Sequence, residues 1–129
     1  MKRALLLALL TVLAAVLNLD SRSFGRPPYK KQWDATYKNP QLVAAAKEAK
    51  CSVCHYGTDK KNRNDYGKAL SKHLNEKLYN QLKGDPKALD RKIQEAFKAV
   101  AKEKSASGKT FGELLEAGRL PGTPPRGSQ

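Results

Sequence analysis

Two cysteines and a histidine occupy one short stretch of this 129-residue chain, in the order C-x-x-C-H at Cys51, Cys54 and His55. They are the only cysteines in the sequence and include the first of its two histidines. A small domain with few large apolar side chains usually needs a disulfide, a metal or a large cofactor to stabilise its fold. This stretch is the one candidate place for such a group, so its chemistry decides what the chain can fold into.

The N-terminal segment predicts the compartment in which these cysteines work. Lys2 and Arg3 precede a fourteen-residue apolar run, residues 4–17, and polar and small residues follow it. This layout is typical of a secretory signal peptide, and the run is short for a membrane span. We assign residues 1–23 to the signal peptide, with an uncleaved N-terminal anchor as the alternative. The remainder is expected to be exported and periplasmic, with membrane association only if the segment is retained.

The charge of the chain bears on its partners. The formal net charge is +13, and it stays strongly positive without residues 1–23. A basic exported protein favours an acidic protein partner or an anionic surface, whereas export argues against nucleic acid. The lysines are spread along the whole chain, so a solvated lysine-rich surface is an equally good interpretation.

The apolar pattern predicts an all-α fold. Residues 40–50 form a short helix that begins at Asn39-Pro40 and runs into Cys51, and a second helix spans 66–83, where apolar residues recur every four positions. Gly84-Asp85-Pro86 ends that helix and begins a third one at 86–104. No strand pattern is visible.

The ends of the chain look less regular. Residues 24–39 are interpreted as an irregular lead, and the proline- and glycine-containing tail 121–129 is expected to be disordered. Between them, Thr110 to Glu113 matches a capping box that begins a last short helix. The predicted domain therefore covers residues 40–120. Phe97, central on the apolar stripe of the third helix, is expected to lie in the core and to contact any cofactor.

In an exported protein, C-x-x-C-H indicates covalent attachment of one haem c. Residues three apart lie on one face of a helical turn, so Cys51 and Cys54 can both form thioethers to one porphyrin, and His55 can bind the iron axially. A disulfide or redox pair between the cysteines is the simplest alternative. Zinc is a weaker one, because only His73 remains as a further ligand of this type.

The same residues resemble a family. The sequence AKCSVCH at 49–55, the Lys60-Lys61 pair, Asn64 and YGKAL at 66–70 are similar to small exported single-haem c-type cytochromes of planctomycete-type bacteria. TFGEL at 110–114 and LPG at 120–122 resemble their C-terminal segment. The resemblance is specific at C-x-x-C-H and N-x-Y-G. It implies a mostly helical cytochrome c-like fold around one haem, with Cys51 and Cys54 bonded to it.

The second axial position of the iron is left open. The only methionine is Met1, in the export segment, so methionine cannot be the ligand. By angle, His73 falls on the apolar arc of the 66–83 helix and is a possible second ligand; a lysine or an open position are the alternatives. No proline lies between Pro40 and Pro86 to supply a carbonyl that orients His55, so another acceptor is required.

The function expected from these features is one-electron transfer by an exported monohaem cytochrome. No constellation of general acid, base or nucleophile accompanies the motif, so we expect a carrier and not an enzyme. One alternative is a five-coordinate haem protein that binds or senses a small ligand. Another is a basic helical binding module without haem, stabilised by a Cys51–Cys54 disulfide.

Overall fold

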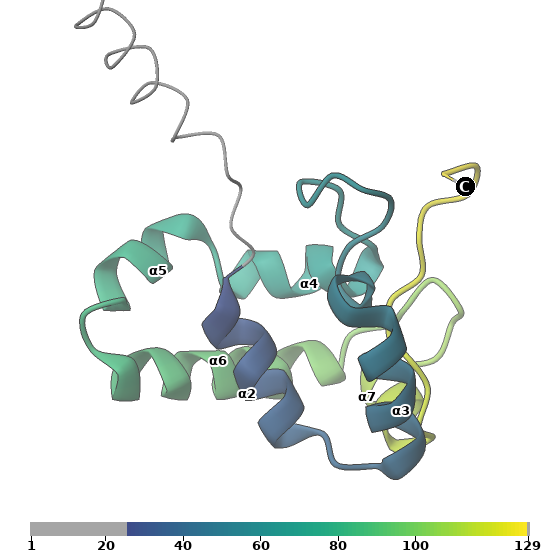
Figure 1. The fold of residues 1–129 in the computed structure, drawn as a ribbon, viewed down its shortest axis with the longest axis horizontal. Coiled ribbons are helices and arrows are strands. Elements are labelled where there is room, and N and C mark those ends of the chain that lie inside the picture. The colour runs from purple at the N-terminus through teal and green to yellow at the C-terminus, as the bar shows by residue number, and fades with distance from the viewer. Residues whose placement is uncertain (1–25, 129) are drawn as a thin grey trace, which may run out of the picture.

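A computed structural model describes residues 26–128, and within that range the fold is all-α (Figure 1). Its elements are α2 (Pro27–Thr36), α3 (Pro40–Ala49), the 3-10 turn η2 (Lys50–Val53), α4 (Asp65–His73), α5 (Glu76–Leu82), α6 (Pro86–Ala101) and α7 (Phe111–Glu116). No strand occurs among these residues; only two isolated bridges do, His55 with Arg63 and Lys104 with Thr110. The prediction of an all-α fold is therefore confirmed. The signal peptide assigned to 1–23 lies outside the described residues.

The long helix α6 is the centre of the packing. It contacts α2, α4, α5 and α7, and Figure 1 shows α4 running above it while α2 crosses it. Its buried face consists of the apolar stripe that the sequence predicts: Leu89, Ile93, Ala96, Phe97 and Val100. Burial of this stripe against four neighbouring helices removes apolar surface from water and stabilises the domain.

Side-chain caps fix where most of the helices begin. Asn39, Asn64, Asn75, Asp85 and Thr110 each accept a hydrogen bond from a backbone N–H of the helix that follows. The capping box is confirmed, because Thr110 accepts from the Glu113 N–H and the Glu113 carboxylate accepts from the Thr110 N–H. None of the helices among residues 26–128 is long and apolar enough to cross a membrane.

The interpretation of residues 24–39 as an irregular lead is wrong for most of that segment. Pro27–Thr36 form α2, whose prolines occupy the first turn, where a missing N–H costs nothing. The helix buries Trp33, whose indole N–H donates to the Tyr66 hydroxyl at 3.1 Å. Trp33 therefore belongs to the core of the same domain.

The single helix predicted for residues 66–83 is divided in the structure. α4 ends at His73, Leu74 adopts a non-helical conformation, and Asn75 caps α5 by accepting from the Leu78 N–H. The four-residue recurrence of leucines concealed this break, although Asn75-Glu76 is a good helix start. The division changes the direction of every side chain after Leu74 relative to α4.

The first part of the expected disordered tail is packed, so that prediction is wrong for residues 121–123. Pro121 is fully buried. Thr123 donates its N–H to the Asp65 carboxylate at 2.5 Å, and its carbonyl accepts the Asp65 N–H at 3.2 Å. We call Pro121–Thr123 the C-terminal strap. The strap lies against the start of α4.

Candidate functional site

The C-x-x-C-H residues form a tight turn at the end of α3, which we call the motif turn (residues 50–55). The carbonyl of Cys51 accepts the N–H of Cys54 at 3.2 Å and that of His55 at 3.0 Å. Cys51 is exposed, Cys54 is half-buried, and both thiols are free of a disulfide. The turn is entered through Lys50, the one non-glycine residue among those described with a positive φ, at 51°.

His55 has a defined ring orientation. Its Nδ1 lies 3.1 Å from the Asn62 carbonyl oxygen, which also accepts the Tyr56 N–H at 3.2 Å. A carbonyl can only accept, so Nδ1 carries the proton and Nε2 keeps its lone pair. Burial lowers the pKa of His55 below its ordinary value, against the opposing effect of the Asn62 hydrogen bond. The ring is therefore neutral and able to bind a metal through Nε2 near neutral pH.

Asn62 is the acceptor that the sequence could not identify. A backbone carbonyl has no signature in the identity of its own residue, and this one is brought to His55 by the loop from Gly57 to Arg63. That loop returns to the motif turn through the isolated bridge between His55 and Arg63. The second coordination layer of a histidine ligand commonly contains such a carbonyl.

Asn64 joins the motif turn to α4. Its Oδ1 accepts the Gly67 N–H at 2.9 Å, and its Nδ2 donates to the carbonyls of Ser52 and Val53 at 3.3 and 3.1 Å. Its own N–H donates to the Cys54 carbonyl at 3.0 Å. The residue is 1% exposed, so water cannot replace these bonds.

Gly67 explains the second half of the N-x-Y-G sequence. A side-chain carbon at this position would overlap with the Cys54 carbonyl oxygen and would press on Arg63. α4 therefore approaches the motif turn as closely as a backbone permits, which only glycine allows. Tyr66, the residue before it, is fully buried and bonded to Trp33.

Cys54 lies against the core, whereas Cys51 faces solvent. Burial raises the pKa of the Cys54 thiol to about 12, and the nearby Lys30 ammonium opposes this shift. The thiol is thus protonated at neutral pH. Although both cysteines belong to one turn, Cys51 is exposed to solvent and Cys54 is half-buried.

His73 is more exposed than its place on the apolar arc of the helix predicts. Its side chain is 39% exposed at the last residue of α4, with Nε2 3.5 Å from the Glu103 carboxylate. Lys72 reaches the same carboxylate at 3.2 Å. His73 lies at the end of the face that packs on α6, because Glu103 follows that helix directly and Leu74, the next residue, is buried. Its role as an axial ligand stays a prediction.

Phe97 is confirmed as a core residue. It is 2% exposed, and its ring centroid lies 5.8 Å from that of Tyr37. Tyr37 in turn packs 5.1 Å from Trp33. The aromatic residues thus join α2 to α6. The expected contact between Phe97 and a cofactor stays a prediction.

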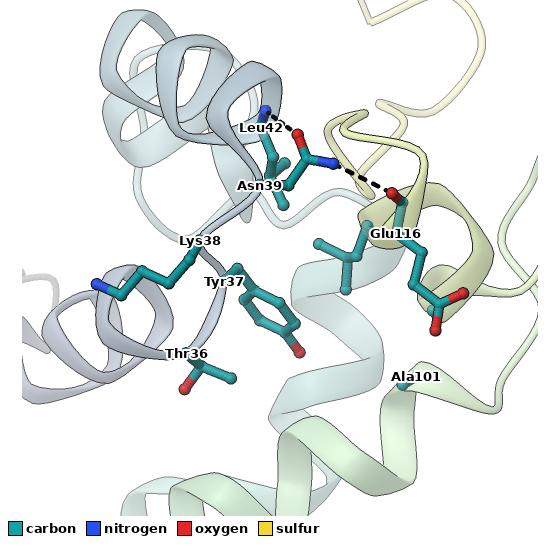
Figure 2. Close-up of a pocket in the computed structure, with 9 residues that line it drawn as sticks. Thr36, Tyr37, Lys38, Asn39, Leu42, Ala101 and Glu116 are labelled. Atoms are coloured by element: carbon teal, nitrogen blue, oxygen red, sulfur yellow. Dashed lines mark hydrogen bonds between the residues drawn. The ribbon is translucent and has the colours of Figure 1, made fainter.

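The described residues also form an open pocket of about 250 Å³ away from the motif sequence (Figure 2). It is lined by Thr36, Tyr37, Lys38, Asn39 and Leu42 together with Ala101, Gly112, Leu115 and Glu116. Figure 2 shows the Asn39 side chain bridging Leu42 and the Glu116 carbonyl at its rim. No residue of the motif turn lines it.

Within residues 26–128, no group of three or more histidine, cysteine or acidic side chains is arranged to hold a metal ion. The motif turn itself carries two thiols and one imidazole, of which Cys51 is exposed and Cys54 half-buried. Comparison of the chain with family models, with curated proteins and with solved structures gives no match.

Proposed function

We propose that the protein is an exported single-haem c-type cytochrome that transfers one electron at a time. Cys51 and Cys54 would bond the haem c, and His55 would be its axial ligand through Nε2. The donor set fits this group: two free thiols in one turn, followed by a neutral imidazole. The iron supplies the redox chemistry when bound, whereas the chain holds and orients it.

The observation that carries the proposal is the hydrogen bond from His55 Nδ1 to the Asn62 carbonyl. It fixes the tautomer and the plane of the ring, and it frees the nitrogen that must bind iron.

Charge near the motif turn supports the proposed acidic redox partner. Lys50, Lys61 and Arg63 are all exposed within or beside this turn and its loop. Cationic side chains around a redox centre accelerate encounter with an acidic protein, and salt screens the effect.

The test is production of the full-length chain in a bacterial host that exports proteins and attaches haem. We expect a haem-staining band on a denaturing gel and a pyridine haemochrome spectrum of the c type. Replacing both cysteines, Cys51→Ser with Cys54→Ser, should abolish the covalent band. A colourless wild-type protein from a host that loads a control cytochrome c would overturn the proposal.

A second candidate is a five-coordinate haem protein that binds or senses a small ligand. The position of His73 favours it, because this side chain pairs with Glu103 at the surface and Met1 is the only methionine. The ferric absorption spectrum distinguishes the two. High-spin iron that takes up cyanide or carbon monoxide rapidly supports the second candidate, and low-spin iron that resists both supports electron transfer.

A further inference from the structure

Three consecutive carbonyl groups of the motif turn are bonded by a single residue. The Asn64 amide donates to the carbonyls of Ser52 and Val53, and the Asn64 N–H donates to that of Cys54. Buried backbone carbonyls need such partners, and a 3-10 turn leaves its last ones free. Asn64 therefore determines how the motif turn sits on the domain.

The C-terminal strap covers Asn64 from outside. At Gly122 a side-chain carbon would overlap with the Asn64 amide, so the strap backbone lies directly against it. The Asp65 carboxylate accepts the Thr123 N–H and, at 2.8 Å, the Ala106 N–H. Ala106 and Thr123, both more than forty residues further along the chain, thus bond the neighbour of Asn64, while Gly122 covers Asn64 itself.

The same loop also orients His55. Asn62, whose carbonyl accepts from the His55 ring, lies two residues before Asn64. Because Asn64 fixes the end of this loop against Cys54, it also fixes where the Asn62 carbonyl stands. Displacement of Asn64 therefore changes both the turn that carries the cysteines and the hydrogen bond of the histidine.

We infer that Asn64, enclosed by the C-terminal strap, is a positioning residue that sets the orientation of His55 and Cys54 at the site. The part of this inference that concerns the iron rests on the proposed function. The part that concerns the motif turn does not.

The decisive variant is Asn64→Asp. Aspartate caps α4 as well as asparagine does, so helix capping survives. Its carboxylate cannot donate to the Ser52 and Val53 carbonyls, and it would place negative charge against them. The matched control is Asn75→Asp, because Asn75 caps α5 in the same way and is exposed.

The first measurement is hydrogen–deuterium exchange on the full-length protein as purified, with or without haem. In Asn64→Asp we expect the amides of Cys54 and His55 to exchange about tenfold faster or more, whereas those of α6 keep their protection. Asn75→Asp should change neither. Equal exchange at Cys54 and His55 in the two variants would overturn the inference.

The second measurement is the reduction potential of the haem-loaded protein, which a purely structural role would not move. Weakening of the bond from His55 to Asn62 makes the imidazole a poorer electron donor. The potential should therefore rise in Gly122→Ala, which displaces Asn64 without adding a charge, and not in Gly84→Ala, where a side-chain carbon meets nothing within 4 Å. An unchanged potential with haem bound would overturn the inference about His55. Absence of haem would overturn the proposed function alone, because exchange still tests the motif turn.

A second variant guards against failure of the first to fold. Gly122→Ala leaves Asn64 intact and displaces it from the strap side, so it should raise exchange at Cys54 and His55 in the same way. Gly84→Ala is its control, because a side-chain carbon there would meet nothing within 4 Å. Unchanged exchange in Gly122→Ala would contradict the role of the strap.

Discussion

The two ends of α4 differ in how the chain determines them. At the first end Asn64 is 1% exposed and satisfies three carbonyls, and Gly67 contacts the Cys54 backbone. At the last end His73 is 39% exposed and shares the Glu103 carboxylate with Lys72. Buried polar groups must each find a partner, whereas surface charges are solvated in many arrangements. Specific residues are therefore required at the first end and not at the last.

The same contrast applies to the two residues considered as ligands on opposite sides of the proposed iron site, His55 and His73. The side that carries His55 is built from hydrogen bonds to backbone carbonyls. The residue expected to serve the other side, His73, lies among solvated charges. Substitutions at the first end of α4 should therefore cost far more stability than substitutions at the last.

The largest effect is expected for Gly67→Ala. Alanine is worth about 1 kcal/mol more than glycine inside a helix, but here its side chain would overlap with the Cys54 carbonyl. Overpacking typically costs about 1–3 kcal/mol, and overlap with a backbone carbonyl belongs at the upper end, about 3 kcal/mol. We therefore expect a net loss of about 2 kcal/mol in the free energy of unfolding, measured in urea. Gly84→Ala, with open space around it, should change stability by less than about 0.5 kcal/mol. A Gly67→Ala variant as stable as this control would show that the contact is not required.

Replacing Lys50, where the chain enters the motif turn, should stabilise the protein, whereas Gly67→Ala should destabilise it. Lys50 has φ 51° and ψ −114°, a conformation that glycine adopts readily and other residues do not. We expect Lys50→Gly to raise the free energy of unfolding by about 1 kcal/mol, after allowance for the extra entropy of glycine in the unfolded chain. Lys47→Gly, within the exposed face of α3, should lower it by about 1 kcal/mol. A loss of stability in both would mean that Lys50 makes contacts that outweigh its strain.

Some parts of the fold could be predicted from sequence because one local signal was sufficient. The stripe on α6 and the Thr110–Glu113 capping box are of this kind. α2 was missed because Pro27 and Pro28 suggested irregular chain, although prolines suit a first turn. The break at Leu74 was missed because leucine periodicity outweighed the Asn75 cap.

The candidate site likewise has some features that the sequence reveals and others that it does not. The C-x-x-C-H residues and the likeness at N-x-Y-G were visible in the sequence, since both depend on residue identity. The Asn62 carbonyl and the strap contact with Asn64 were not, because they depend on backbone brought together by the folded chain. The exposure of His73 depends on where α4 ends, which its helical angle alone does not give.

His73→Ala tests the other end of α4. An exposed contact between an imidazole and a carboxylate contributes little, so the free energy of unfolding should change by less than about 0.5 kcal/mol. Because His73 lies against Glu103, we expect the ferric spectrum of the haem-loaded variant to match that of the wild type. Glu103→Gln weakens the contact without altering His73, and it should likewise leave the free energy of unfolding and the ferric spectrum nearly unchanged. Conversion of a low-spin wild type to high-spin iron by His73→Ala alone would identify His73 as the sixth ligand and contradict the contrast between the two ends.

The smallest effect is expected at the exposed cap of α7, which is the surface counterpart of the buried Asn64 cap. Hydrogen bonds from the Thr110 backbone and side chain hold the pKa of Glu113 below its ordinary value of 4.5. A lowered pKa in the folded state means that the carboxylate stabilises the protein above about pH 4.5 and loses this effect as the pH falls through the folded pKa. Thermal unfolding across this range should therefore show wild type and Glu113→Gln converging in acid. In a Thr110→Val background, which removes the side-chain partner, the destabilisation caused by Glu113→Gln at neutral pH should be smaller than in the wild-type background. A destabilisation of the same size in both backgrounds would show that the Glu113 carboxylate acts through the Thr110 N–H and the helix dipole, and not through the Thr110 hydroxyl.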